Sequence, residues 1–398
     1  MRLRPGLVTD YRSDTGIFRS VTQRTWFGLL LVLAVYLGAG GALGPIRLSS
    51  DLLVLTVYAL FASIGAIGLN VVTGMAGQIS LGHAFFLGLG AYTAAVLGGV
   101  EQTREVVDTV TGQAVTEVAM RGFHLDMIIW LPAAGLVAAL AGLIVAPVAT
   151  RLRGLYLAFV TLGLVFLGEH IFREARTLTG GAGNGRSTAE ARLLGFRFDQ
   201  DGEVFGLWLT KQQKLLFLGL ILLIVMGLAA KNLFRSRVGR ALAAIRDRDI
   251  AAEMMGIPLG RYKLIAFTIS SFYAGIAGAL FWAVVGRLTA EGFNFLLSIK
   301  YIAMIMIGGV ATVSGSIMGA FFIIFLPKMV EWLASVQVFS VTPFFFISKD
   351  PAGMINTFQF EQILFGLFIV GFLILEPMGL YGIWIRVRNY WKGWPFSY

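Results

Sequence analysis

The chain of 398 residues is 57% hydrophobic and only 14% charged, contains no cysteine, and carries a formal net charge of +10 at pH 7. A soluble protein needs a polar surface built from about 25% charged residues, so the composition excludes a soluble fold and predicts a helical integral membrane protein. The lack of cysteine excludes disulfides and thiolate metal sites, and the three widely spaced histidines form no metal-ligand pattern.

A membrane-spanning helix requires about 20 mostly apolar residues, and ten segments approach this length. In chain order they are Trp26–Leu43, Leu52–Val72, His83–Val100, Met127–Thr150, Leu155–Phe172, Leu215–Ala230, Leu264–Val285, Ile299–Ala311, Ile317–Leu333 and Ile363–Leu380. The eighth is short and is followed by glycines, which indicates a broken or tilted helix. We therefore expect an all-α membrane protein, a polytopic helical bundle of about ten transmembrane helices, some of them interrupted by glycine.

Charge orients the bundle. When the N-terminus is placed in the cytoplasm, the loops that then lie inside hold most of the Lys and Arg and few acids, as the positive-inside rule requires. We therefore expect cytoplasmic termini, with tails over residues 1–25 and 381–398 and a permease domain over residues 26–380. The first apolar segment also resembles a secretory signal, but its length favours a retained helix. This orientation explains the excess of Lys and Arg over Asp and Glu, so the net positive charge does not indicate nucleic-acid binding.

Two polar interruptions divide otherwise apolar sequence. Asn70–His83 holds three glycines together with Gln78 and Ser80, and Met306–Ser316 holds a similar run in the second half of the chain. Unwound backbone at membrane depth is tolerated where it is buried in protein or lines a cavity, and exposed helix ends can bind a carboxylate. The pair indicates a substrate site between the two halves. The alternative is a pair of tightly packed turns.

The segment Lys231–Lys263 is a polar segment of more than thirty residues between two long apolar ones. Its composition predicts two short helical pieces with basic faces, ended by Gly256 with Pro258 close behind. Such a segment can offer a surface to a soluble partner. The alternative is a solvated loop that obeys the positive-inside rule.

Other candidate sites are weaker. The run Thr179–Gly185 could form a nest of N–H donors or a flexible turn, and it lacks the P-loop pattern. Glu169 is the one acid inside a clearly apolar run, beside His170. The sequence shows no carboxylate pair, no serine-histidine-acid set and no metal cluster, so we expect no catalytic residues, no metal site and no cofactor.

An ordered set of runs resembles a known family. The runs GLNVVTGMAGQISLGHAFFLGLGAYTAA, RLRGLYLAFVTLGLVFLGEHIFR, TGGAGNG, SRVGRALAAIRDRDIAAEMMGIPLGRYKLIAFTISSFYAGIAGAL, FNFLLSIKYIAMIMIGGVATVSGSIMGA and EPMGLYG resemble the permeases of branched-chain amino acid ABC importers. The similarity is greatest to the subtype that pairs with a second, related permease, and it covers Leu52–Gly382.

The resemblance implies a set of partners and a location. The chain would lie in the bacterial plasma membrane as a multi-pass protein, beside a second permease subunit. Two ATP-binding-cassette ATPase subunits would bind ATP and dock on the loop 231–263, and an extracytoplasmic substrate-binding protein would deliver the solute. In that family the cytoplasmic loop carries an EAA-type motif. Here Ile250 stands where Glu is common, with Asp249 before it and Gly256 after it.

From the residues and the resemblance together we expect two sets of functional residues. The ATPase coupling residues are Gly239, Arg240, Arg246, Asp249, Ala251, Ala252 and Gly256. The substrate pathway residues are Gly77, Gln78, Ser80, His83, Tyr156, Thr161 and Glu169.

The expected function is import of branched-chain or other hydrophobic amino acids by alternating access driven by partner ATPases. One alternative is a permease for urea, amides or other small carboxylated solutes, which related permeases move. The outer segments 101–126 and 333–362 are larger than usual for the family and bear on this choice. The other alternative is a self-sufficient secondary transporter or channel, which would require membrane-embedded acids along its path.

Overall fold

A computed structural model describes residues 49–393, apart from residues 108–113, 153, 182–184, 205–206, 336–346 and 349–354, and a few scattered residues between 25 and 38. The expected tail 1–25 and first span Trp26–Leu43 therefore lie almost wholly outside the described residues, as do the middle of the Gly-rich run and most of the segment 333–362.

The described part of the chain is mostly helical. Its helices are α3 (Ser50–Asn70), which continues as a π-helix (Val71–Met75), α4 (His83–Gly98), α5 (Met127–Arg151), α6 (Leu155–Glu174), α7 (Arg176–Thr179), α8 (Lys211–Arg235), α9 (Arg237–Asp247), α10 (Asp249–Met254), α11 (Leu259–Val285), a 3-10 helix (Ala290–Phe293), α12 (Phe295–Gly308), α13 (Val313–Ser335), α14 (Thr357–Leu375) and α15 (Gly379–Gly393).

Short strands occupy the polar connections and form two-stranded pairs. The antiparallel pairs are β1 (Gln102–Val107) with β2 (Ala114–Met120), β3 (Arg186–Ser187) with β8 (Arg287–Leu288), β4 (Arg192–Leu193) with β5 (Phe196–Arg197), and β6 (Gly202–Val204) with β7 (Leu207–Leu209). The parallel pair is β9 (Ile347–Ser348) with β10 (Ile355–Asn356).

The expectation of a helical membrane protein is confirmed in its coarse form. Among the described residues, six helices are long and apolar enough to cross a membrane: α3, α5, α6, α8, α11 and α13. Three shorter apolar helices, α4, α12 and the middle of α14, overlap three of the four remaining expected spans, and the fourth is Trp26–Leu43. The number of ten spans and the side on which the termini lie stay predictions.

The centre of the bundle is formed by α3 and α11. Helix α11 packs against α5, α3 and α4, while α3 also packs against α13 and α8. Close approach depends on glycine, because a Cβ atom on Gly90 of α4 would strike the backbone of Gly275 on α11. These contacts bury most of α3 and α11, which agrees with their largely apolar sequences, since a helix that is buried on most sides needs no polar face.

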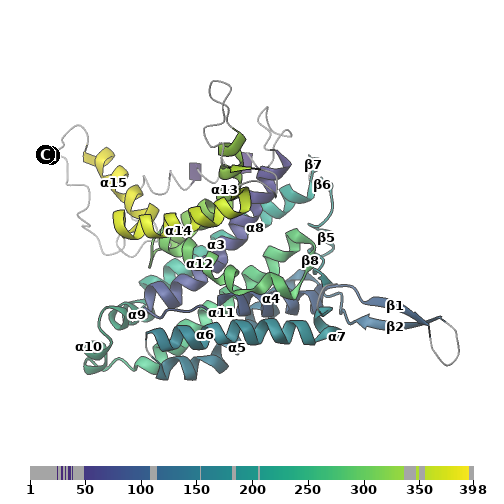
Figure 1. Cartoon of the computed structure of the whole chain (residues 1–398), viewed down its shortest axis with the longest axis horizontal. Helices are drawn as coiled ribbons and strands as arrows, with labels where there is room; N and C mark the ends of the chain where they lie inside the picture. The colour runs from purple at the N-terminus through teal and green to yellow at the C-terminus, as the bar shows by residue number, and fades with distance from the viewer. Residues whose placement is uncertain are drawn as a thin grey trace.

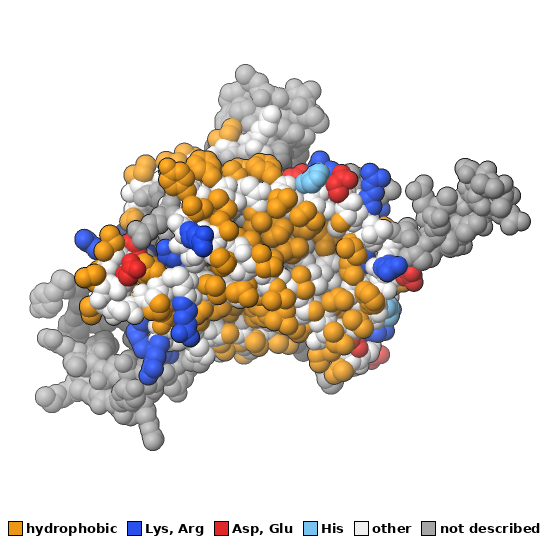
Figure 2. All heavy atoms as spheres, turned by 90° about the horizontal axis from the view of Figure 1, so that it is seen from below, with side chains coloured by type: hydrophobic (Ala, Val, Ile, Leu, Met, Phe, Trp, Pro, Cys, Tyr) orange, Lys and Arg blue, Asp and Glu red, His pale blue; other side chains and the backbone are white. Residues whose placement is uncertain are grey.

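The two ends of the bundle differ in structure. Helices α9, α10 and α15 lie toward the left of Figure 1, while α7 and most of the strand pairs lie toward the right, with the β1–β2 hairpin projecting from the body. Figure 2 shows that hydrophobic side chains cover most of the face seen from below, with charged side chains toward its margins. An apolar belt between polar ends matches the requirements of a bilayer.

Candidate functional site

The first polar interruption is a real break in a buried helix. Helix α3 passes into the π-helix Val71–Met75 and then into irregular backbone, and α4 begins at His83. The side chains of Gln78, Ser80 and His83 are all buried. A π-helical turn often marks a functional position, and unwound backbone at this depth needs protein or a cavity around it.

Asn70 joins this break to the second interruption. Its Nδ2 donates to the carbonyl oxygen of Thr312 at 2.9 Å and to Oγ of Ser316 at 2.7 Å. Its Oδ1 accepts from the backbone N–H of Ala311 at 2.8 Å. Since Asn70 is fully buried, these bonds are shielded from water and specific in geometry. The two interruptions therefore lie side by side.

Arg246 connects the polar segment 231–263 to the same break. Its Nη1 donates to the carbonyl oxygen of Gly74 at 3.2 Å. Gly77 lies against it with φ of +67°, and a Cβ atom added to Gly77 would come within 2.9 Å of the Arg246 Cγ. Arg246, which was expected to act in ATPase coupling, is thus in direct contact with Gly77, which was expected in the substrate pathway.

Thr161 of α6 and the start of α4 complete this buried region. The Thr161 hydroxyl accepts from the backbone N–H of Leu81 at 2.9 Å. The Ser298 hydroxyl accepts from the N–H of Ala84 at 3.0 Å, so α12 supports the first turn of α4. The His83 ring lies 4.9 Å from the ring of Tyr301, measured between centroids.

Several buried polar atoms of the break have no hydrogen-bond partner among the described residues. They are both amide atoms of Gln78, Nε2 of His83 and the hydroxyl of Thr73. Most buried polar groups in proteins are paired, and each exception calls for an explanation such as a ligand, an ion or water. The concentration of such atoms at one break therefore marks it as a candidate binding region.

Two of the expected pathway residues lie elsewhere. Tyr156 is 74% exposed on the outer face of α6. Glu169 accepts from Arg173 at 2.9 Å one turn away on the same helix, and Arg173 also lies 3.7 Å from Glu291. The structure brings together Gly77, Gln78, Ser80, His83 and Thr161, but it does not bring Tyr156 or Glu169 to them.

The segment 231–263 forms two short helices, as expected. Ser236 ends α8 and caps α9, because its hydroxyl accepts from the N–H of Gly239 at 3.3 Å. A Cβ atom on Gly239 would strike the Phe234 carbonyl, which makes this glycine part of the tight turn. The helical run breaks at Arg248, whose φ of −156° and ψ of 100° are extended, and this position was not anticipated from composition.

Helix α10 presents an exposed apolar patch, which we define as Ile250, Met254 and Met255. Ile250 is 66% exposed and both methionines are 84% exposed. Ala252 faces inward and is buried, whereas Ala251 is exposed. Exposed apolar clusters at a polar surface mark interaction sites, and methionine adapts to many partner shapes.

The other expected coupling residues have local roles. The Arg240 Nη1 donates to the carbonyl oxygen of Arg235 at 2.9 Å and thereby secures the end of α8. The Asp249 carboxylate accepts from the N–H of Ile250 at 2.9 Å at the start of α10. Gly256 adopts φ of +80°, the left-handed conformation expected of a glycine that ends a helix.

Sequence reasoning missed Asn70, Ser316 and the α10 patch. Asn70 stood at the boundary of an apolar span, where one polar residue is unremarkable. The sequence did contain a sign of the α10 patch, since three large apolar residues in a charged segment are unusual. The partners of Asn70 lie more than 240 residues away, and no local pattern points to them.

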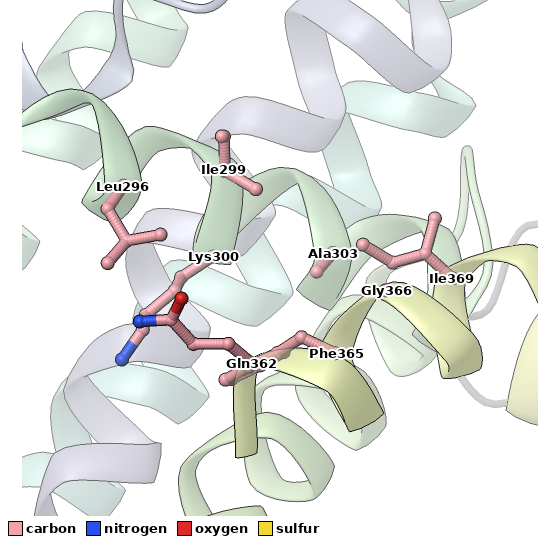
Figure 3. Close-up of a pocket in the computed structure, with 8 residues that line it drawn as sticks. All are labelled: Leu296, Ile299, Lys300, Ala303, Gln362, Phe365, Gly366 and Ile369. Atoms are coloured by element: carbon pink, nitrogen blue, oxygen red, sulfur yellow. The ribbon is translucent and has the colours of Figure 1, made fainter. Parts of the chain in front are cut away.

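A separate cavity of about 220 Å³ lies between α12 and α14 (Figure 3). It is lined mainly by apolar residues, with Lys300 and Gln362 near one another on facing helices. The Lys300 ammonium lies 5.4 Å from the centre of the Phe365 ring, within cation–π range. None of the expected site residues lines this cavity.

The opposite end of the molecule carries a network of charges. Arg197 pairs with Glu190 at 3.3 Å and with Asp199 at 3.2 Å, and its bond to Asp199 raises the Arg197 pKa. Arg186 is buried, donates to the carbonyl oxygens of Leu178 and Arg121, and has its pKa lowered by burial. These contacts hold the connections at this end of the molecule to one another. Among the described residues, no group of three or more His, Asp or Glu could hold a metal ion.

Comparison with known proteins shows that the amino-acid sequence is similar to those of transport permeases. Residues 52–375 match the family described as the permease component of the branched-chain amino acid transport system. The high-affinity branched-chain amino acid transport system permease protein LivM of Escherichia coli K12 is 32% identical over 317 residues, which are 77% of this chain and 68% of LivM. LivM of Salmonella typhimurium is 32% identical over 76% of this chain and 67% of its own length.

A more distant relative covers a similar region. The permease protein BraD of the Pseudomonas aeruginosa high-affinity branched-chain amino acid transport system is 26% identical over 67% of this chain and 80% of BraD. No solved structure matches the chain.

Proposed function

The chain belongs to the family of branched-chain amino acid ABC transporter permeases, and from that premise we propose that it imports branched-chain or other hydrophobic amino acids. It is a multi-pass protein of the bacterial plasma membrane and a transporter subunit. In this proposal the substrate moves inward by alternating access, and partner ATPases supply the energy.

The contact between Arg246 and the carbonyl oxygen of Gly74 carries the proposal. It joins the helices α9 and α10 to the broken helix that holds Gln78, Ser80 and His83. A movement imposed on α9 would therefore reach the break through one hydrogen bond and the packing of Gly77 against Arg246. Coupling between two sites requires such a physical connection to an element that can adopt two arrangements.

The α10 patch supports docking of an ATPase. Three exposed apolar side chains, Ile250, Met254 and Met255, project from a short helix that Gly256 ends sharply. A short helix with apolar anchors fits the groove of a soluble partner, and Arg240 and Arg248 provide a basic margin. We assign the loop 231–263 to two ATP-binding-cassette subunits, which bind the ATP.

The other proposed partners follow from the family and the surfaces. Helices α5 and α6 present exposed apolar residues along their outer faces, including Leu140, Ile144 and Phe159, which suit lipid or a second permease subunit. The connections around β1–β2 and β3–β8 lie at the end opposite α10, where an extracytoplasmic substrate-binding protein would dock.

The alternative of a self-sufficient secondary transporter gains no support from Glu169. That carboxylate pairs with Arg173 near the outer end of α6 and does not join the break. A proton- or ion-driven path would need an acid within it. The alternative of a permease for urea, amides or other carboxylated solutes differs only in substrate.

Uptake by reconstituted vesicles tests the function. The vesicles contain this chain, the second permease and the ATPases. ATP is enclosed in the lumen, on the side of the ATPases, and the binding protein is added outside. We expect ATP-dependent accumulation of radiolabelled leucine and none when ATP is omitted. ATP-dependent uptake of urea without leucine would replace the substrate assignment, and leucine uptake that follows an ion gradient without ATP would overturn the proposal.

A further inference from the structure

A second cavity of about 220 Å³ lies at the end of the molecule that carries α9 and α10. Four segments meet around it: the break after α3, the connection between α5 and α6, the junction of α9 with α10, and the start of α11. This space is well above that needed for a single water molecule. It is distinct from the apolar cavity of Figure 3 in both place and chemistry.

Gln78 is the most informative residue in its lining. Its side chain is only 6% exposed, yet neither its amide nitrogen nor its amide oxygen has a partner among the described residues. A buried polar group without a partner destabilises the folded protein, and a ligand that pairs with it removes that cost. A ligand with both a hydrogen-bond donor and an acceptor would satisfy both atoms.

Charges of both signs surround the same space. Its lining includes Arg248, Lys263 and Asp249, together with Arg246, which bonds to the Gly74 carbonyl and to Asp247. Polyanions such as nucleotides would meet the carboxylates of Asp247 and Asp249, which opposes their binding. A zwitterion can place its carboxylate near the cations and its ammonium near a carboxylate.

Part of the lining is apolar. Leu152 and Leu157 come from the connection between α5 and α6 and the start of α6, Ile245 comes from the end of α9, and Leu157 and Ile245 are buried. An aliphatic side chain would lose contact with water against these residues. The lining therefore combines an amide without a hydrogen-bond partner among the described residues, charges of both signs and an apolar wall, which together match an amino acid with an aliphatic side chain.

We propose that this cavity is a subsite for a free α-amino acid with an apolar side chain, occupied as the substrate leaves toward the ATPases. The proposal rests on the proposed function and adds a place and a recognition chemistry to it. The ligand would contact Gln78 on the broken helix and the junction of α9 with α10 at once. Substrate that accumulates on this side would then hold the coupling helices against the break and slow further import.

Protection of a single cysteine tests the subsite without transport. The chain has no cysteine, so Leu152→Cys places one thiol in the lining of the purified full-length protein. We expect leucine to slow its reaction with a maleimide in proportion to occupancy, by about tenfold at ten times the dissociation constant. Asp247→Cys, at an exposed position of the same lining, provides a second probe if Leu152→Cys does not fold.

Matched controls use the cavity between α12 and α14. Leucine should leave the labelling of Gly366→Cys unchanged, since a Cβ atom there meets open space and the cavity lacks acids.

In the Leu152→Cys background, Gln78→Leu and Arg248→Gln should each raise the leucine concentration for half-protection about tenfold or more. Gln362→Leu makes the same side-chain change as Gln78→Leu in the other cavity and should have no effect.

The ligands themselves distinguish the possible occupants. Leucine should protect, whereas isocaproate, which lacks the ammonium group, and inorganic phosphate should not. Equal protection by isocaproate or phosphate would show an anion site and overturn the amino-acid assignment. Absence of leucine protection, or protection insensitive to both Gln78→Leu and Arg248→Gln, would also overturn it. Neither result would touch the proposed function if ATP-driven leucine uptake persists in the vesicles.

Discussion

At the scale of single residues, the buried break is held by a few specific contacts. Asn70 uses both ends of its amide to join the end of α3 to the connection between α12 and α13 and to the first turn of α13. Gly74 follows one helical turn later, and a Cβ atom there would strike the Asn70 amide and the Ala311 nitrogen. The glycine therefore belongs to the same clamp, because only a residue without a side chain leaves room for the amide.

From the structure of the break we expect Gly77→Val to abolish transport. Gly77 has φ of +67° and lies against Arg246, so valine would impose strain of about 1–3 kcal/mol and also crowd the arginine. We expect uptake of leucine in reconstituted vesicles to be lost while the complex remains assembled. Ser80→Leu should do the same, because Ser80 is 3% exposed and leucine would overpack its site.

Gly163→Val is the matched control for this experiment. Gly163 lies in α6 with a negative φ and with no atom within 4 Å of an added Cβ. Its variant should transport normally. Normal uptake by Gly77→Val and Ser80→Leu would show that the break is only a packed turn.

At the scale of elements, helices α9 and α10 form a unit shaped by turns at both ends. Ser236 and Gly239 allow the chain to turn directly from α8 into α9, and Gly256 reverses it after α10. The short α10 gains little stability from its own hydrogen bonds. Its orientation therefore depends on these turns and on the burial of Ala252.

Gly256→Val tests the role of α10. A Cβ atom at Gly256 meets open space, so the substitution acts only through its φ of +80°, which a β-branched residue adopts at a cost of about 1–3 kcal/mol. We expect reduced recovery of the ATPases with the affinity-purified permease and a parallel loss of uptake, with membrane insertion unchanged. Gly260→Val, also in open space but without a positive φ, should keep both. Full ATPase recovery with Gly256→Val would contradict docking through α10.

At the scale of the whole molecule, the structure has two polar ends separated by an apolar belt. The end with α9 and α10 holds the break, the mixed-charge cavity and the apolar patch. The other end holds the strand pairs and the ion pairs of Arg192 and Arg197. From the positive charge of the segment 231–263, we expect the first of these ends to face the cytoplasm.

Two matched cysteine substitutions test that orientation. Glu203→Cys lies on β6 and Glu253→Cys on α10, and both glutamates are exposed. In intact cells, an impermeant maleimide should label the first and not the second, because only the first faces outward in this topology. After the membrane is made permeable, both should react. Labelling of Glu253→Cys in intact cells, with Glu203→Cys protected, would invert the topology.

The sequence by itself determined the helical membrane class, the positions of most apolar helices, the two interruptions and the left-handed turn at Gly256. These features follow from local composition, since span length, glycine content and a helix stop are each visible within about 20 residues. The tertiary structure alone decided that Asn70 joins the two interruptions and that Arg246 reaches Gly74. It also decided that Tyr156 faces outward and that Glu169 pairs with Arg173. Such contacts depend on which helix faces meet, and apolar helices of this kind carry no periodic pattern that reveals their facing sides.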